Sequence, residues 1–228
     1  MKPFLARAAV HTLRFYRSPS ELVAVAPSPV PSEPWYTEPW RLHDAFNLAT
    51  LPPAIILVTL ALAYRTSFNR PLALYMLVYM LLDALWIGLQ PFVVKSPEVL
   101  LVHHVGSVLL LLHSLTYAPH LRYAAWMIVV EVNTLLLIAR RHFKSLQTLL
   151  NAAFYATWLA IRVVWFPVVA VHLWRLPQGS WPSVLRRVAV CGTVSGLASL
   201  QLWWTRAALK PMLAAKKQEG TQKRGSWL

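Results

Sequence analysis

Four ionisable residues lie within long apolar stretches of the sequence: Asp83, His103, His104 and Glu131. Imidazole titrates near neutral pH and can act as a general base or a nucleophile once a carboxylate orients it. Adjacent histidines with carboxylates in the same apolar region therefore indicate acid–base chemistry, acyl transfer through a histidine, or a metal site. A charged group at the centre of a membrane helix costs about 2.5–3.5 kcal/mol on insertion scales, so such residues usually face the bundle interior and mark function.

A metal or haem site is the least favoured of these interpretations. Adjacent helical residues project about 100° apart, so His103 and His104 cannot chelate one ion as histidines four residues apart do. Haem needs histidines on facing helices; His113 and His172 could pair, but no other feature of the sequence supports it. We therefore expect no metal and no cofactor. The remaining alternative to a functional site is a polar cluster that only fixes helix packing.

The composition places these residues in an integral membrane protein. Hydrophobic residues make up 57% of the 228 residues and charged residues 13%, about half the share near 25% that is typical of soluble domains. A soluble domain cannot bury this much apolar surface and still present a solvated exterior. The eleven tryptophans suit membrane interfaces. The single cysteine, Cys191, excludes an internal disulfide.

Six apolar stretches provide the elements that must position the ionisable residues. Each is close to the roughly 20 residues that span a bilayer, and the loops between them are short enough to make consecutive helices antiparallel neighbours. The stretches are 46–64, 71–90, 97–118, 121–139, 145–171 and 184–205. We predict an all-α integral membrane fold, with a six-helix bundle over 46–206. A basic tail and proline-rich linker (1–45) precede the bundle, and a basic tail (207–228) follows it.

Polar and aromatic residues recur at helical spacing within four of these stretches, which predicts a wet or ligand-filled bundle interior. The stripes are Tyr75, Tyr79, Asp83, Trp86 and Gln90; His103, Ser107 and Ser114; Met127, Glu131 and Thr134; and Thr148, Asn151, Tyr155, Trp158, Arg162 and Trp165. Asp83, His103 and Glu131 should share a depth on the order of 10–12 Å from the cytosolic helix ends. Besides the four ionisable residues, the candidate lipid-binding residues are Tyr79, Ser107, Thr134, Tyr155 and Arg162. Gly192 and Gly196 predict close helix packing.

The net charge of +14 reflects where the basic residues lie. Fifteen Lys and Arg residues lie in the two tails and the second and fourth loops, against six in the other loops. The positive-inside rule then places both termini in the cytosol, facing anionic lipid headgroups. Nucleic acid binding would suit such a charge in a soluble protein, but here the charges flank apolar spans, so we expect none. The first twenty residues are basic and amphipathic if helical, which leaves a mitochondrial or plastid address open.

The order and spacing of these motifs resemble the TLC domain family over roughly 46–206. The matching residues are Tyr79 and Asp83; Leu101-Val102-His103-His104; Glu131-Val132-Asn133-Thr134 followed by Arg140; Arg162 with Pro167; and Gln201-Leu202-Trp203-Trp204. The resemblance implies a six-helix bundle, often in the endoplasmic reticulum, that is linked to lipid synthesis, transport or sensing. Ceramide synthases of this family use their histidine pair to transfer an acyl chain from acyl-CoA to a long-chain amine.

The chain departs from the synthases of that family at three positions. Val130-Glu131 stands where the synthases have a His-Asp pair, Thr134 lies near the place of a further Asp, and Ser107 replaces a Thr. The resemblance is therefore closer to the branch that does not make ceramide.

Three functions follow, of which the first is the leading hypothesis. A multi-pass membrane protein would bind, sense or remodel membrane lipids within its bundle. The alternative is an acyl-CoA-dependent lipid acyltransferase of the ceramide-synthase kind, in which His103 or His104 is the acyl acceptor or base and Asp83 or Glu131 orients it. The third is a non-catalytic membrane chaperone or trafficking protein, in which the cluster only stabilises the bundle.

Overall fold

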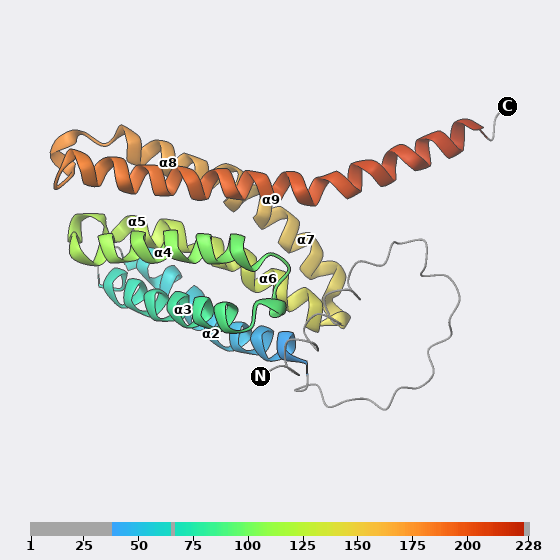
Figure 1. The fold of residues 1–228 in the computed structure, drawn as a ribbon, viewed down its shortest axis with the longest axis horizontal. Helices are drawn as coiled ribbons and strands as arrows, with labels where there is room; N and C mark the ends of the chain where they lie inside the picture. The colour runs from blue at the N-terminus through green and yellow to red at the C-terminus, as the bar shows by residue number, and fades with distance from the viewer. Residues whose placement is uncertain (1–37, 65–66, 226–228) are drawn as a thin grey trace, which may run out of the picture.

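The computed structural model describes residues 38–64 and 67–225, with side chains through Arg206, and these residues form helices joined by short turns (Figure 1). The longer helices are α2 (Pro39–Tyr64), α3 (Asn69–Leu89), α4 (Pro97–Thr116), α5 (Leu121–Ile128), α6 (Val130–His142), α7 (Gln147–Thr157), α8 (Phe166–Arg175) and α9 (Val184–Gly225). Short 3-10 helices cover Pro91–Val93, Ala118–His120, Lys144–Leu146 and Gln178–Ser180, and a π-helix, η6, covers Trp158–Trp165. The amphipathic start that the sequence suggests lies outside the described residues.

Five segments are long and apolar enough to cross a membrane, which confirms the predicted class of all-α integral membrane protein. They are Pro39–Tyr64, Asn69–Leu89, Pro97–Thr116, Ala118–His142 and Lys144–Arg175. Each overlaps one of the first five predicted stretches, although the first begins seven residues earlier than predicted. The sixth stretch, 184–205, forms the first part of α9, which is not among these five segments, so the count of six spans stays a prediction.

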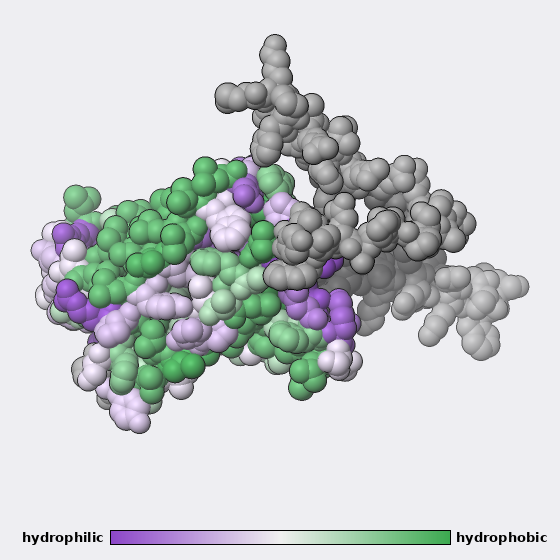
Figure 2. Space-filling model, turned by 90° about the horizontal axis from the view of Figure 1, so that it is seen from below, coloured by the Kyte–Doolittle hydropathy of each residue, from purple (hydrophilic) through white to green (hydrophobic). Residues whose placement is uncertain are grey.

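The outer surface of the bundle is apolar, as a hydrocarbon environment requires. Leu85, Val102 and Leu185 are all more than half exposed, and Figure 2 shows broad apolar areas on the face that it displays. The interior instead holds buried polar side chains, among them Asp83, His104 and Glu131. These polar residues lie among a larger set of buried apolar side chains, while lipid tails solvate the outer leucines and valines.

Helix α2 begins at Pro39, not at residue 46, so part of the predicted proline-rich linker is helical. Proline suits the first turn of a helix because its missing N–H would have no partner there. The same logic starts α4 at Pro97, with Glu98 in the first turn. Ser96 precedes Pro97 and accepts a backbone hydrogen bond from Leu100, but its side chain makes no capping hydrogen bond.

The helices lie in layers, with α8 and α9 on one side, α4, α5 and α6 in the middle, and α2 and α3 on the other side (Figure 1). Helices α2 and α3 pack together on one side, α4 packs against α3 and α9, α6 packs against α2, and α8 packs along α9. Gly106 of α4 lies so close to α9 that an added Cβ would be 3.3 Å from Leu197 Cδ2. The predicted packing role of Gly192 and Gly196 is wrong within this chain, because nothing lies within 4 Å of an added Cβ at either position.

Candidate functional site

The buried carboxylate of Asp83 on α3 lies between two histidines from neighbouring helices. Its Oδ2 is 2.8 Å from Nε2 of His104 on α4, and its Oδ1 is 2.7 Å from Nε2 of His43 on α2. All three side chains are less than one-tenth exposed. We call these residues the His–Asp–His cluster. It ties three helices together in a region where water does not compete for the hydrogen bonds.

The second nitrogen of His104 is also engaged. Its Nδ1 donates to the carbonyl oxygen of Leu100, one turn earlier on α4, over 2.6 Å. A carbonyl oxygen can only accept, so this contact fixes the proton on Nδ1. Both ring nitrogens of His104 are therefore occupied within the protein, and neither is free for a ligand.

Helix α2 extends this network toward Tyr79, the predicted residue one turn before Asp83. The Tyr79 hydroxyl donates to Oδ1 of Asn47 over 2.5 Å, and Asn47 Nδ2 donates to the His43 carbonyl oxygen over 3.0 Å. The stripe predicted on α3 thus exists, and it faces α2. Sequence reasoning missed His43 and Asn47, although their four-residue spacing places them on one helical face; the prolines before them suggested a linker.

His103, which precedes His104 on α4, does not belong to the His–Asp–His cluster and points in a different direction. The two rings are in edge contact, with centroids 5.6 Å apart, and His103 also meets the ring of Trp204 on α9. Its Nδ1 is buried and has no hydrogen-bond partner among the described residues. Buried polar atoms are seldom left in this way, so an unpaired nitrogen marks a place where a ligand or water completes the site.

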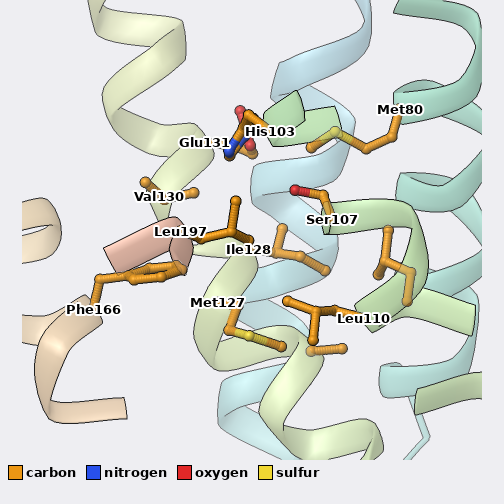
Figure 3. Close-up of a pocket in the computed structure, with 12 residues that line it drawn as sticks. Met80, His103, Ser107, Leu110, Met127, Ile128, Val130, Glu131, Phe166 and Leu197 are labelled. Atoms are coloured by element: carbon orange, nitrogen blue, oxygen red, sulfur yellow. The ribbon is translucent and has the colours of Figure 1, made fainter. Parts of the chain in front are cut away.

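A narrow cavity of about 40 Å³ opens beside His103. Figure 3 shows His103 and Glu131 together at one end of it, Ser107 next, and Met127 and Leu110 toward the other end. The other lining residues are Met80, Leu111, Ala124, Ile128, Val130, Phe166 and Leu197. The cavity therefore has a polar end and long apolar walls.

Glu131 on α6 joins this polar end from a third direction. Its side chain is buried, and Thr134, one turn later on α6, accepts a hydrogen bond from Arg162. The predicted convergence of Asp83, His103, His104 and Glu131 is thus real in space. They divide into two groups, with Asp83 and His104 bonded to each other and His103 and Glu131 facing the cavity.

Arg162, a predicted lipid-binding residue, is buried in a network of neutral acceptors. Its Nε donates to Asn133 Oδ1 over 2.9 Å, its Nη2 donates to Thr134 Oγ1 over 3.0 Å, and its Nη1 donates to Gln201 Oε1. The rings of Trp158 and Trp204 lie against the guanidinium, with centroids 5.0 and 5.9 Å from Cζ. Arg162 therefore joins α6, η6 and α9 beside the cavity and is not one of its lining residues.

The remaining predicted lipid-binding residue, Tyr155, does not join the site. It is 52% exposed and lies near Arg140, with Cζ 5.7 Å from its ring centroid. The physical reason is the π-helix that begins at Trp158. Its wider turn changes the angular relation between Tyr155 and Arg162, which a uniform α-helix would place on one face.

No cluster of three or more His, Cys, Asp or Glu residues that could hold a metal ion occurs in the described part of the chain. The suggested pairing of His113 with His172 is wrong. Nε2 of His113 is 2.9 Å from Nδ1 of His120 instead, and Nε2 of His120 donates to the Ser180 carbonyl oxygen. These contacts join the α4–α5 turn to the α8–α9 loop, away from the His–Asp–His cluster.

At the other end of the bundle from His113 and His120, an ionic contact of Asp44 joins α2 to α6. Asp44 is buried, and its two oxygens lie 3.0 Å from Arg141 Nη2 and 2.8 Å from His142 Nε2. It immediately follows His43, so one turn of α2 carries both the ion pair and a member of the His–Asp–His cluster. The ion pair anchors that turn against α6.

Comparison with known proteins gives one match. The family model described as the TLC domain matches residues 31–210. That range includes the first turns of α2, with His43 and Asn47, as well as the four ionisable residues singled out in the sequence. No curated protein matches the chain, and no solved structure matches it.

Proposed function

Because the chain belongs to the TLC domain family and is a multi-pass membrane protein, we propose that it binds a membrane lipid inside its helical bundle. The lipid chain lies along the apolar walls formed by Leu110, Met127 and Phe166. Its polar end lies beside His103, Ser107 and Glu131. The protein thereby senses, carries or remodels that lipid, in keeping with the part of the family that does not make ceramide.

One observation carries this proposal: the unpaired Nδ1 of His103 lies at the polar end of a cavity that is otherwise apolar. Ligand sites in proteins commonly combine apolar walls with a few convergent polar groups, which fix the orientation of the ligand. A lipid matches both parts of such a site. Water could pair with His103 but would gain nothing from the apolar walls.

At about 40 Å³ the cavity is too small for a whole lipid chain. Met80 and Met127 line it, and methionine side chains adapt readily because they are unbranched and have three rotatable bonds. We therefore expect the chain to enter by displacing these two side chains, with the helix backbones nearly unchanged. The His–Asp–His cluster holds α2, α3 and α4 in place while this happens.

We also propose an orientation and a location for the protein, on the basis of its basic residues. Arg141 and His142 lie at the same end of the bundle as Asp44 and the start of α2. Under the positive-inside rule this end faces the cytosol, together with both termini, and the endoplasmic reticulum is the proposed membrane. Protease access to an N-terminal tag in sealed microsomes tests the orientation; protection of the tag would contradict it.

The first test is photo-crosslinking of purified full-length protein in nanodiscs, with a lipid that carries a diazirine in its chain. Labelled peptides should include Met127 and Leu110, and excess unlabelled lipid should compete. Leu110→Trp fills the cavity and should reduce this labelling severalfold. Leu109→Trp is the matched control, because Leu109 is exposed on the same helix and its replacement should leave cavity labelling unchanged.

Thermal unfolding of each variant separates a filled cavity from a disrupted fold. Should Leu110→Trp fail to fold, Ser107→Leu narrows the cavity with a smaller side chain and replaces it. Absence of competable labelling of cavity residues in the wild-type protein would refute lipid binding. The non-catalytic chaperone or trafficking function would then be the better account of the cluster.

A second candidate is acyl transfer from acyl-CoA, and the free nitrogen of His103 favours it. In that reaction His103 would be the base or acyl acceptor, since both nitrogens of His104 are occupied. However, Asp83 bonds His104 and His43, so it does not orient His103. Incubation with labelled acyl-CoA and a sphingoid or ethanolamine acceptor tests this candidate: product that is lost in His103→Ala would support it, and no turnover across acceptor classes would exclude it.

A further inference from the structure

The protons of the His–Asp–His cluster can be counted from its contacts. His104 donates through Nδ1 to a carbonyl oxygen, and its Nε2 is 2.8 Å from an Asp83 oxygen. Two facing lone pairs would repel, so one further proton lies between these two atoms. Whether nitrogen or oxygen holds that proton, His104 and Asp83 together carry no net charge.

The contact with His43 adds no charge. Its Nε2 is 2.7 Å from the other Asp83 oxygen, so a neutral His43 with its proton on Nε2 donates to the carboxylate. The fewest protons that satisfy all three contacts therefore leave the cluster neutral. The Asn47 amide and Tyr79 hydroxyl that extend it are neutral groups as well.

Arg162 and Glu131 are the second pair of groups near the cavity whose charges can balance. Arg162 donates to neutral acceptors from Asn133, Thr134 and Gln201. Glu131 lies one turn before Thr134 on α6, so it is on the face of α6 that meets Arg162. An ionised Glu131 would balance the charge of Arg162, and both side chains are buried. The groups that line the polar end besides Glu131 are His103 and Ser107, which offer hydrogen bonds without adding a carboxylate or a permanent cation.

We infer that the polar end of the bound lipid carries no net charge and pairs with Nδ1 of His103. The inference rests on the proposed lipid site and names the class of lipid that the site accepts: single-chain lipids with an uncharged polar end, such as an alcohol or a primary amide. A charged end would enter an interior whose own charges already balance. It would lose its hydration without gaining a free counter-ion.

The test uses four photoactivatable probes that share one diazirine-bearing chain and differ in the end group: alcohol, sulfonamide, sulfonate and trimethylammonium. Sulfonamide and sulfonate are nearly identical in shape, so their comparison isolates the charge. A sulfonate is preferred to a carboxylate because a carboxylate can take up a proton on burial. The readout is competable labelling of Met127 and Leu110 in the purified full chain.

The alcohol and sulfonamide probes should label the cavity at least roughly tenfold more than the sulfonate and trimethylammonium probes, because burial of an unpaired ion carries a large desolvation penalty. Equal or stronger labelling by either ionic probe would overturn this inference and leave lipid binding intact. Failure of all four probes to label the cavity would overturn the proposed lipid site itself. The two failures are therefore distinguishable.

Two variants test the charge balance directly. Glu131→Gln removes the anion that faces Arg162, so labelling by the sulfonate should rise relative to the sulfonamide. Arg162→Gln changes the balance in the opposite sense and should favour the trimethylammonium probe. Tyr155→Phe, outside the site, is the control with unchanged ratios. Unchanged ratios in a folded Glu131→Gln or Arg162→Gln protein would refute the balance; should neither fold, the wild-type ratios alone decide.

Discussion

The replacement Asp83→Ala should destabilise the bundle, because Asp83 joins three of its helices. It removes one carboxylate that accepts hydrogen bonds from His43 and His104 at 2.7 and 2.8 Å. All three side chains are buried. Both imidazoles therefore lose their partner at once, in a region where no water replaces it.

The magnitude follows from these hydrogen bonds. A hydrogen bond to a charged group contributes about 1.5–3 kcal/mol, and breaking a buried ion pair costs about 3–5 kcal/mol. Hydrogen bonds between membrane helices are weaker, averaging about 0.6 kcal/mol, because the separated helices find other partners. Because both hydrogen bonds to Asp83 break and both imidazoles are left unpaired, we expect the free energy of unfolding to fall by about 3 kcal/mol.

The assay is reversible unfolding of the purified protein in mixed micelles, followed by tryptophan fluorescence. Tyr79→Phe is the first control, since it removes one neutral hydrogen bond to Asn47 and should cost about 1 kcal/mol. Gln90→Ala is the second, because Gln90 is exposed beyond the end of α3 and should change little. A decrease below about 1 kcal/mol for Asp83→Ala, equal to that of Tyr79→Phe, would refute the view that the cluster holds three helices together.

Three further predictions use the same unfolding assay. Gly106→Val should cost about 1–3 kcal/mol, because its side chain would meet Leu197 on α9. Gly196→Val is the matched control, because an added Cβ there contacts nothing. Equal stability of the two variants would contradict the close approach of α4 and α9. Asp44→Asn should cost about 1–2 kcal/mol, because it weakens the ionic interactions with Arg141 and His142. This cost should persist in high salt because the carboxylate is buried, and a cost abolished by salt would contradict a buried ion pair. Arg162→Lys should cost about 2–4 kcal/mol, since an ammonium cannot reproduce three directed donations, two to α6 and one to α9. Wild-type stability of this variant would show that these hydrogen bonds do not stabilise the bundle.

The membrane class and the approximate positions of the first five spans were predictable because they depend on chain length and side-chain polarity alone. A segment such as Asn69–Leu89 has the length that a bilayer requires. The contact between Asp83 and His104 was also within reach of the sequence. Both residues lie at about the same depth on neighbouring antiparallel helices. Two buried ionisable groups in such positions are expected to form a hydrogen bond with each other.

His43 was not predictable in the same way. A residue is recognised as buried and polar only if its surroundings are recognised as a span, and the prolines before it indicated an extended linker. The structure starts α2 at Pro39, which moves His43 from that linker into the bundle. His43, one of the two partners of Asp83, therefore lies in the part of the sequence where the helix was hardest to predict.

The structure differs from the sequence prediction at two further places, and both differences have local causes that a uniform helical spacing does not include. The π-helix at Trp158–Trp165 leaves Tyr155 exposed although Arg162 is buried. The stripe of Gly192 and Gly196 resembles a packing motif, yet the contact between α4 and α9 uses Gly106 instead. Small residues permit close approach, but the direction in which each helix faces its neighbours decides which of them is used.

The histidine pair shows how the contacts of a residue limit its chemistry. Histidines that are adjacent in sequence point in different directions on a helix, so His104 faces Asp83 while His103 faces the cavity. The cluster satisfies His104 through both nitrogens, which makes it a positioning residue for α4 and leaves His103 with the unpaired atom. If acyl transfer occurs at this site, its base must therefore be His103, which Asp83 does not orient. The same arrangement leaves Nδ1 of His103 available for a hydrogen bond to a bound ligand, which is why we propose binding ahead of catalysis.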